Sequence, residues 1–370
     1  MNEASSHPKH PSGDAATRDP LASLVAELRT HAGSLEEPGA TAAGQLDRMA
    51  AAGVMRWGIP EQYGGCDLSA ADQTEGFERL AAACLVSTFV LSQRNAAVSR
   101  VVASSNESLR RELLPRFSRH EVMATVGISH LTTSRQHLRA PAVTARPDGD
   151  DYVFDGEVPW VTGAAISELV LTGGTLPDGR QLLAFVPADD PGVVIGTPPA
   201  LLALNASQTG SVSLSEVRVD RKHVVAGPVE GVMKAGAGGT GSVTTSALAV
   251  GMAAGVLEHF ALEAARRPEL QPIIEPLQRE RAAISADIRS LLETPAGANP
   301  AGPTSETIRQ RANSLALRTS QAYLAASKGA GFVKGHPAER AVREAMFFLV
   351  WSCPQPVVNA ALRQFACLAE

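Results

Sequence analysis

The sequence predicts an α+β protein in which a compact β-rich segment separates two helical blocks. Within residues 124–228, short apolar runs such as 182–186 and 193–195 stand between Gly, Pro and Asp residues. That spacing is typical of a compact antiparallel sheet or barrel. On both sides the chain is rich in Ala and Leu, which favour helices. We therefore expect a functional site where the three parts meet.

The composition argues against two classes of partner. The net charge of −5 is spread along the chain without a basic block, which argues against nucleic acid and anionic membrane surfaces. No run of about eighteen apolar residues occurs, so we expect no transmembrane helix. Residues 1–20 are polar and lack the apolar stretch of a signal peptide, so we expect a disordered tail.

The cysteines indicate a reducing compartment. They show no metal-ligand spacing, so we expect no metal site and free thiols in a cytoplasmic protein. The cysteines are Cys66, Cys84, Cys353 and Cys367.

The N-terminal block, residues 21–122, is predicted to be all-helical. Apolar residues at Leu21, Leu24 and Leu28 share one helical face. After a tight loop rich in Gly, Ser69 is a good N-cap for the next helix. Within 21–53 we expect a first helix and a second, shorter one that starts around Leu46–Ala50 and ends at Gly53. Further helices are expected over 70–83, 87–105 and 107–117.

The C-terminal block, residues 229–370, is predicted to be a helical bundle. It follows the central β-domain of residues 123–228 in the sequence. A Gly-rich hinge at 236–241 precedes a long helix whose small residues permit close approach of a neighbouring helix. A later helix is expected to end at Gly329, because Gly is the usual residue after a helix C-terminus. The expected helices cover 242–267, 276–294, 305–328, a segment from Pro337 towards Trp351, and a segment after Pro356.

Four sequence motifs carry a resemblance to the acyl-CoA dehydrogenase superfamily. Residues 58–65 read GIPEQYGG, and residues 149–162 contain a Gly-Asp-Asp-Tyr start and a Trp160-Val161-Thr162 end. Residues 207–220 resemble the family's Ser-x-Thr strand pair. The fourth motif combines GAGF at 329–332, PAER at 337–340 and RE at 343–344. Their order and separation over roughly residues 45–350 are similar to those of the family.

The resemblance implies a fold, a cofactor and an assembly. The implied fold has an N-terminal all-α domain, a central β-barrel and a C-terminal four-helix bundle. The implied cofactor is FAD, held at the interface of a homodimer or homotetramer. The implied partners are a small-molecule substrate, such as an acyl-CoA, and an electron-transfer flavoprotein or flavin reductase.

The resemblance also implies cofactor-binding residues on the β-domain. Trp160 and Thr162 match the strand that lies against the isoalloxazine ring, where a donor steadies a reduced flavin. The structural alternative is a buried Trp and a Thr that favours strands. The loop 128–136 matches the family's flavin-binding loop, so Ile128 and His130 are candidates as well. His130 is equally well explained as a solvent-facing loop residue, and the family's Gly-Ser is replaced by Arg135 and Gln136.

Three further cofactor candidates lie in the C-terminal block. Arg266 matches a family Arg that reaches the FAD of a neighbouring subunit, although Phe-Gly is replaced here by Glu269-Leu270. A solvated Arg near a helix C-terminus is the alternative. Gly329 and Gly331 would allow close approach of the adenosine, and a helix C-cap explains Gly329 without a ligand.

The catalytic base of the family is missing from this sequence. Acyl-CoA dehydrogenation needs a carboxylate to remove the α proton of the substrate. At the family's position for that Glu stands Ser352, whose hydroxyl is far too weakly basic. The family's other position for the base falls near Gly241 or Ser242 and also lacks a carboxylate. Cys353 as a thiolate is an alternative, but no basic residue adjoins it in sequence. Three acids elsewhere are expected to be solvated, interhelical or structural: Glu258, Glu263 and Glu344.

Three functions are compatible with these motifs. The first is an FAD-dependent, acyl-CoA dehydrogenase-like oxidoreductase with a relocated base, which passes a hydride from the substrate to flavin N5. The second is a flavin-dependent monooxygenase of the same fold, which needs no α-proton base. The third is a catalytically silent homologue that acts as a binding subunit.

Overall fold

The structure is a computed structural model that describes residues 19–132, 140–234, 243–295 and 302–368. Residues 1–18 of the predicted tail and the predicted hinge at 236–241 lie outside the described residues. The side chain of Asp19 accepts a hydrogen bond from Leu21 N at 3.0 Å and caps the first helix, which begins at Pro20.

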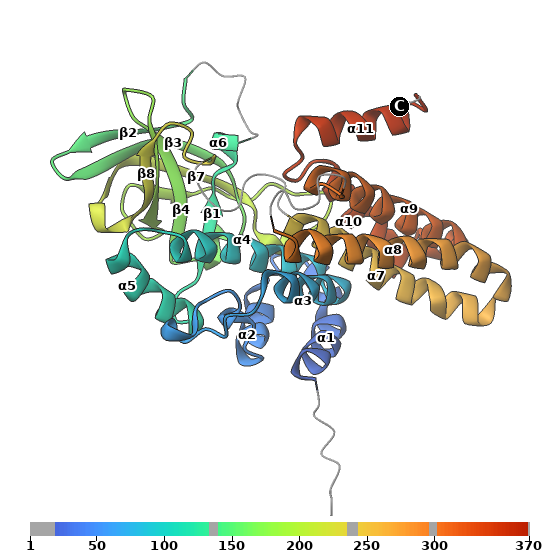
Figure 1. Ribbon diagram of the computed structural model, residues 1–370. Helices are drawn as coiled ribbons and strands as arrows, with labels where there is room; N and C mark the ends of the chain where they lie inside the picture. The colour runs from blue at the N-terminus through green and yellow to red at the C-terminus, as the bar shows by residue number, and fades with distance from the viewer. Residues whose placement is uncertain (1–18, 133–139, 235–242, 296–301, 369–370) are drawn as a thin grey trace, which may run out of the picture.

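The N-terminal helices form the lower part of the molecule in Figure 1. Ser69 caps the third helix as predicted, because its Oγ accepts a hydrogen bond from Asp72 N at 3.1 Å. The predicted segment 21–53 is interrupted by a 3₁₀ turn. The elements are α1 (Pro20–His31), α2 (Ala43–Ala51), α3 (Ala70–Ala83), α4 (Leu85–Val102) and α5 (Glu107–Ser118), with 3₁₀ turns at Gly33–Glu36, Val54–Arg56 and Glu61–Tyr63.

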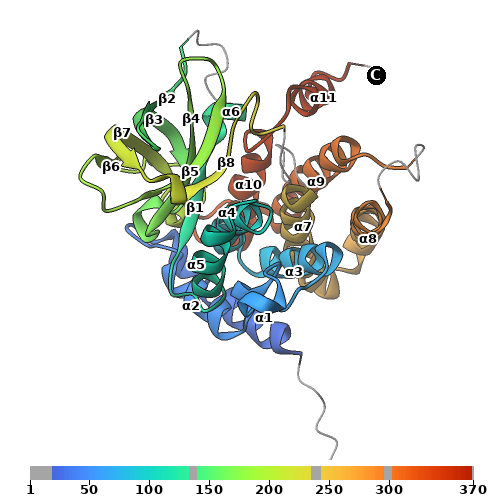
Figure 2. The ribbon, with the colours of Figure 1, turned by 60° about the vertical axis from the view of Figure 1, so that its left-hand side comes forward.

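The helix α4 is largely buried between two cores. Its first half contributes Leu85 and Leu91 to a core that is shared with the C-terminal helices. Its second half packs Val98 and Val101 against the sheet. Figures 1 and 2 both place α4 between the sheet and the C-terminal helices. The helix therefore joins the helical core to the core of the sheet.

The central domain is an eight-stranded mixed sheet in the order β6-β7-β3-β2-β4-β5-β8, with β1 paired to β4. The β1–β4 pair is parallel, so the expectation of a wholly antiparallel sheet is corrected here. The alternation of side chains along one strand does not encode the direction of its neighbour. The strands are β1 (Ala124–Gly127), β2 (Val143–Asp148), β3 (Asp151–Val161), β4 (Leu169–Thr175), β5 (Gln181–Pro187), β6 (Val193–Ile195), β7 (Gly210–Val219) and β8 (Val224–Val229).

One predicted boundary in the C-terminal block is wrong. The second helix begins before Pro276, because Pro272 occupies its first turn and Pro276 is accommodated inside it. The third helix breaks at Lys328, where its end was predicted, because the Lys328 backbone is non-helical (φ 54°, ψ −148°). The positive φ falls on Lys328 and not on the predicted cap Gly329, and a short helical segment continues beyond the break to Gly331. The helices are α7 (Val243–Arg266), α8 (Gln271–Glu293), α9 (Ser305–Gly331), α10 (Pro337–Met346) and α11 (Gln355–Phe365); a short α6 (Ser129–Thr132) precedes β2.

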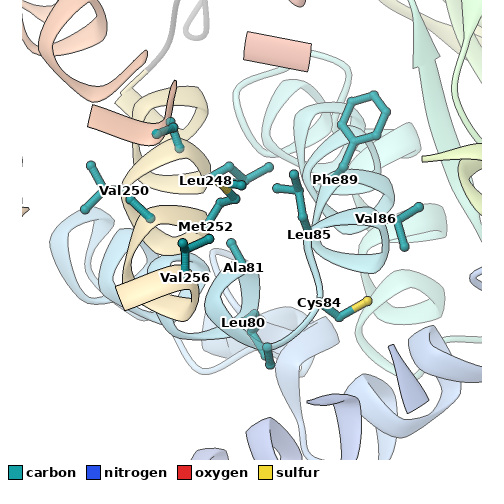
Figure 3. Close-up of a cluster of buried hydrophobic side chains, with 14 of the residues drawn as sticks. Leu80, Ala81, Cys84, Leu85, Val86, Phe89, Leu248, Val250, Met252 and Val256 are labelled. Atoms are coloured by element: carbon teal, nitrogen blue, oxygen red, sulfur yellow. The ribbon is translucent and has the colours of Figure 1, made fainter. Parts of the chain in front are cut away.

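The long helix α7 packs directly onto α3. A Cβ atom added at Gly251 would lie 2.3 Å from the carbonyl oxygen of Glu78, and one at Gly255 would lie 2.3 Å from that of Ala82. The absence of side chains at these positions therefore sets the distance between the two helices. Figure 3 shows the result, with Ala81 of α3 lying toward Met252 and Val256 of α7.

The composition of α7 alone would also suit a membrane span. By its length and its composition, the helix could cross a bilayer. In the folded chain, however, 72% of its most apolar 18-residue window is buried inside the protein. Burial within a helical core accounts for its hydrophobicity.

We expect Gly251→Val to destabilise the protein by at least about 1–3 kcal/mol, because the new side chain would clash with the backbone of α3. Gly33→Ala is the matched control, since a Cβ at Gly33 meets no atom within 4 Å. Urea unfolding of both variants measures the effect. Equal stabilities of the two variants would contradict close α3–α7 packing.

Candidate active site

A cavity of about 820 Å³ lies where the N-terminal helices, the sheet and the C-terminal helices meet. Its walls come from α3 and α4, from β1 and β3, from the loop before β7, and from the segment that follows α10. The volume is within the range of about 300–1,000 Å³ that is usual for ligand pockets. The expected meeting point of the three parts is therefore a real cavity.

Two predicted cofactor residues, Trp160 and Thr162, line this cavity from β3 and from the residue directly after it. Trp160 is 49% exposed, which is unusual for so large an apolar side chain unless a ligand or partner covers it. Thr162 is buried, and its Oγ1 lies 3.0 Å from Thr209 Oγ1, which in turn lies 2.8 Å from Ser207 Oγ. The three hydroxyls form a connected polar strip along the cavity wall.

The opening loop contributes Ile128 and Ser129 to the lining, but not His130. His130 is buried, and its Nε2 lies 2.9 Å from the carbonyl oxygen of Gly173 on β4. The structure thus places this histidine against the sheet and not in solvent. Arg135 and Gln136 of the same predicted loop lie outside the described residues.

Aromatic side chains close the cavity on the C-terminal side. The ring centroids of Phe89 and Phe347 are 4.7 Å apart, and Phe347 stacks on Trp351 at 5.0 Å. Ser352, which stands at the family's position for the base, also lines the cavity. It has a left-handed backbone (φ 48°), which is uncommon for a residue with a side chain.

Acidic side chains are absent from the described lining of the cavity. Among the segments that the structure does not describe, 133–139, 235–242 and 296–301 contain no Asp or Glu in their sequence, whereas 1–18 and 369–370 contain Glu3, Asp14 and Glu370. The charged residues of the described lining are Arg100 and Arg343. Arg343 is neutralised by Glu36 at 2.6 Å and Glu339 at 2.7 Å. The described lining therefore offers no carboxylate that could act as a general base.

Two polar atoms in the lining have no hydrogen-bond partner among the described residues. They are Ser129 Oγ and Asn95 Nδ2, both of which are buried. A buried polar group without a partner is costly, so these atoms indicate contacts with a ligand. Sequence reasoning did not identify Asn95, because an Asn in a helix carries no local signal of what it faces. Ser207 and Thr209 belong to the Ser-x-Thr motif, which by itself does not indicate that their hydroxyls line the cavity.

The other predicted cofactor residues lie far from the cavity within one chain. Thr244 and Thr245 near the start of α7 line the cavity, whereas Arg266 ends that helix about 30–35 Å away by helical rise. Arg266 is exposed and lies 3.7 Å from Glu263. The neighbouring Arg267 donates a hydrogen bond to Ala326 O of α9, which places the end of α9 at the same end of the bundle. Gly329, which is exposed, and Gly331, which is buried, therefore group with Arg266.

A carboxyl group with the pKa of a general base does exist, but outside the cavity lining. Burial raises the pKa of Glu344 to about 7, with Arg340 opposing the shift from 3.8 Å. Glu344 lies beside a separate cavity of only about 40 Å³, together with Cys84, His259 and Arg340. Its position agrees with the structural role predicted for it.

The lining fits a flavin. Trp160 and Ile128 offer apolar surface for a flat ring system. Ser129 Oγ and Asn95 Nδ2, which lack a partner among the described residues, offer hydrogen bonds to its polar edge. The hydroxyl of Thr162 lies on the same wall. These residues would hold the ring; the pyrophosphate end has no comparable set of ligands in the described lining.

Glu344 predicts a specific pH dependence of stability. Its pKa is higher in the folded state than its ordinary value of 4.5, so the unfolded chain releases the proton first. The carboxyl therefore lowers stability as the pH rises from about 4.5 to about 7, by about 3 kcal/mol in total. Between pH 5 and pH 8 we therefore expect the free energy of unfolding of the wild type to fall by about that amount, and that of Glu344→Gln not to show this fall. Glu61→Gln on the surface is the control, and a pH-independent difference would contradict the assignment.

Comparison with known proteins agrees with this architecture. The sequence model of the family "Acyl-CoA dehydrogenase, N-terminal domain" matches residues 15–121. A probable acyl-CoA dehydrogenase of Bacillus subtilis, YngJ, is 23% identical over 341 residues, which cover 86% of this chain and 88% of that protein.

Solved structures share the fold over nearly the whole chain. The polyketide-biosynthesis protein FkbI has a TM-score of 0.79 at 20% identity, covering 94% of this chain and 99% of its own. The glutaryl-coenzyme A dehydrogenase complex has a TM-score of 0.78 at 18% identity, covering 96% and 97%. The dibenzothiophene monooxygenase TdsC of Paenibacillus has a TM-score of 0.73 at 17% identity, covering 93% and 95%. The four motifs, the family-model match over residues 15–121 and the shared fold together support membership of this chain in the acyl-CoA dehydrogenase superfamily.

Proposed function

We propose that this chain is a flavin-dependent oxidoreductase that acts without a carboxylate base, of the monooxygenase type. The observation that carries the proposal is the cavity, which holds Trp160 and Thr162 on one wall and Ser352 among aromatics on another, with no acid in its described lining. Removal of an α proton from an acyl thioester requires a base that a Ser hydroxyl does not provide. Hydroxylation with O₂ and a reduced flavin has no such requirement.

The residues of the chain have distinct roles in this proposal. The flavin, when bound, supplies the two-electron redox chemistry. Ser129 and Asn95 would orient its polar edge, and the strip formed by Thr162, Thr209 and Ser207 would hold hydrogen bonds at the wall of β3. The aromatic cluster excludes water from the reacting atoms, which strengthens these polar contacts.

The substrate is proposed to be uncharged or anionic. The charged lining residues in the described part of the cavity are both arginines, and the remaining lining combines apolar side chains with hydroxyls and amides. A cationic substrate would meet no compensating charge. The cavity walls alone do not favour an acyl-CoA over another small molecule.

Acyl-CoA dehydrogenation with a relocated base is the second candidate. The relatives favour it, because YngJ is named a probable acyl-CoA dehydrogenase and a glutaryl-coenzyme A dehydrogenase complex shares the fold. In this case the base has to come from outside the described lining, for example from a second copy of the chain. The same arrangement, as a homodimer or homotetramer, would be needed for Arg266, Gly329 and Gly331 to reach the flavin. The third expectation, a catalytically silent homologue, would require a cavity that takes up no flavin.

Flavin uptake is tested with the purified chain and either FAD or FMN. We expect yellow protein, and we expect Ser129→Ala to weaken flavin affinity by roughly 2–10-fold through loss of one hydrogen bond. Ser215→Ala, at an exposed position of β7, is the matched control. Colourless protein that binds neither flavin would overturn both enzymatic functions.

The reaction type is tested with the holoprotein. We expect no anaerobic bleaching of the flavin by a panel of acyl-CoAs, and oxygen-dependent turnover of an uncharged or anionic substrate when NADH and a flavin reductase supply electrons. Ser352→Glu places a carboxylate in the cavity wall, so we expect this variant to gain bleaching by acyl-CoAs, with Ser352→Gln as the isosteric control. Bleaching of the wild type at a comparable rate would exclude the base-free proposal and favour dehydrogenation.

A further inference from the structure

A buried arginine lies beneath the turn that closes the cavity. Arg309 of α9 is 1% exposed, and its Nη2 donates a hydrogen bond to Trp351 O at 2.7 Å. Its guanidinium carbon lies 5.7 Å from the centre of the Trp351 ring. The Nε and Nη1 atoms of Arg309 have no hydrogen-bond acceptor among the described residues. Two charged donors thus lack an oxygen acceptor in the described interior, and the sulfur of Cys353 is the weak acceptor beside them.

The thiol of Cys353 is next to this guanidinium. The Cys353 Sγ lies 3.1 Å from Phe348 O, 3.4 Å from Trp351 O and 3.9 Å from Asn313 Nδ2. Burial lowers the pKa of Arg309 to about 10, and the neighbouring Cys353 opposes that shift. The side chain of Cys353 is only partly buried, so small reagents can reach it. In sequence, Arg309 and Cys353 are 44 residues apart, and nothing in the linear pattern connects them.

The two groups are chemically mismatched as they stand. A thiol is a weak acceptor, whereas the Arg309 guanidinium presents two donors that need an oxygen. The amide nitrogen of Asn313, which donates to Phe348 O at 2.7 Å, lies 3.9 Å from the same sulfur. An oxygen atom attached to Cys353 Sγ would supply the missing acceptor, and a charge-assisted bond to Arg309 would hold it.

We propose that Cys353 is a site of oxidative modification, in which Arg309 binds the oxygen that a peroxide places on the sulfur. In the step, Sγ attacks one oxygen of hydrogen peroxide, an S–O bond forms and the O–O bond breaks. The sulfur loses two electrons, the peroxide gains them, and the thiol proton leaves with the second oxygen as water. The product is a sulfenic acid, the first and reversible stage of cysteine oxidation.

The modification would affect the cavity by changing the turn that forms part of its wall. Cys353 follows Trp351 and Ser352, which both line the cavity, and its sulfur contacts the carbonyls that shape this turn. An added oxygen that draws Arg309 away from Trp351 O would release one of the bonds that hold the turn. This inference does not depend on the reaction that the cavity carries out.

The test is peroxide treatment of the full chain followed by dimedone trapping and peptide mass spectrometry. The cysteines Cys66 and Cys367 are the internal controls, because both are more exposed than Cys353. We expect dimedone labelling of Cys353 to be on the order of tenfold faster than that of Cys66. We expect Arg309→Met to reduce the labelling of Cys353 to the rate of Cys66. Equal rates for Cys353 and Cys66 in the wild type, or an unchanged rate in Arg309→Met, would overturn the proposal.

A second pair of variants tests the oxygen site if Arg309→Met does not fold. Cys353→Asp places oxygens permanently beside Arg309, and Cys353→Asn has the same shape with one acceptor and no charge. We expect Cys353→Asp to have the higher melting temperature of the two, because its carboxylate satisfies the Arg309 donors. A lower melting temperature for Cys353→Asp would show that the site rejects a negatively charged oxygen and would exclude the proposed product.

Discussion

The enclosure of α4 is the constraint on which most of this architecture depends. Its first half packs against helices and its second half against the sheet, so one largely buried helix joins the two kinds of structure. Between these halves, Ser92, Gln93, Asn95 and Ala96 face the cavity. The cavity is therefore a consequence of α4 passing from one core to the other. The close contact of α7 with α3 through Gly251 and Gly255 completes the helical side of the enclosure.

The chemistry of the cavity depends on the side chains that line it. Hydroxyls, amides and aromatic rings predominate, and the described lining carries guanidinium groups but no carboxylate. The one carboxyl group whose pKa is raised to about 7, that of Glu344, is kept away from the cavity in a small internal space of its own. The described lining thus has apolar surface and hydrogen-bonding groups that fit a flavin, but it lacks a carboxylate of the kind that acyl-CoA dehydrogenation uses as a base.

Part of the candidate site could be predicted from sequence and part could not. Trp160, Thr162, Ile128 and Ser352 were found through local motifs, and the structure places all four at one cavity. Arg266, Gly329 and Gly331 belong to equally local motifs, yet within one chain they gather at the other end of the bundle. His130 lies against β4, because the short helix α6 turns its ring towards the carbonyl of Gly173. A motif identifies a residue but does not indicate which residues contact it in the folded chain.

By itself, the sequence determined the succession of helices, sheet and helices, the Ser69 cap, and the resemblance to the superfamily. These features depend on periodicity, capping chemistry and short motifs, which act over a few residues. Only the tertiary structure decided the parallel pairing of β1 with β4, the unpartnered Asn95 and Ser129 in the lining, and the meeting of Arg309 with Cys353. Each of these features depends on residues that are far apart in the sequence. How close such residues come is set by the packing of whole helices and strands around the core.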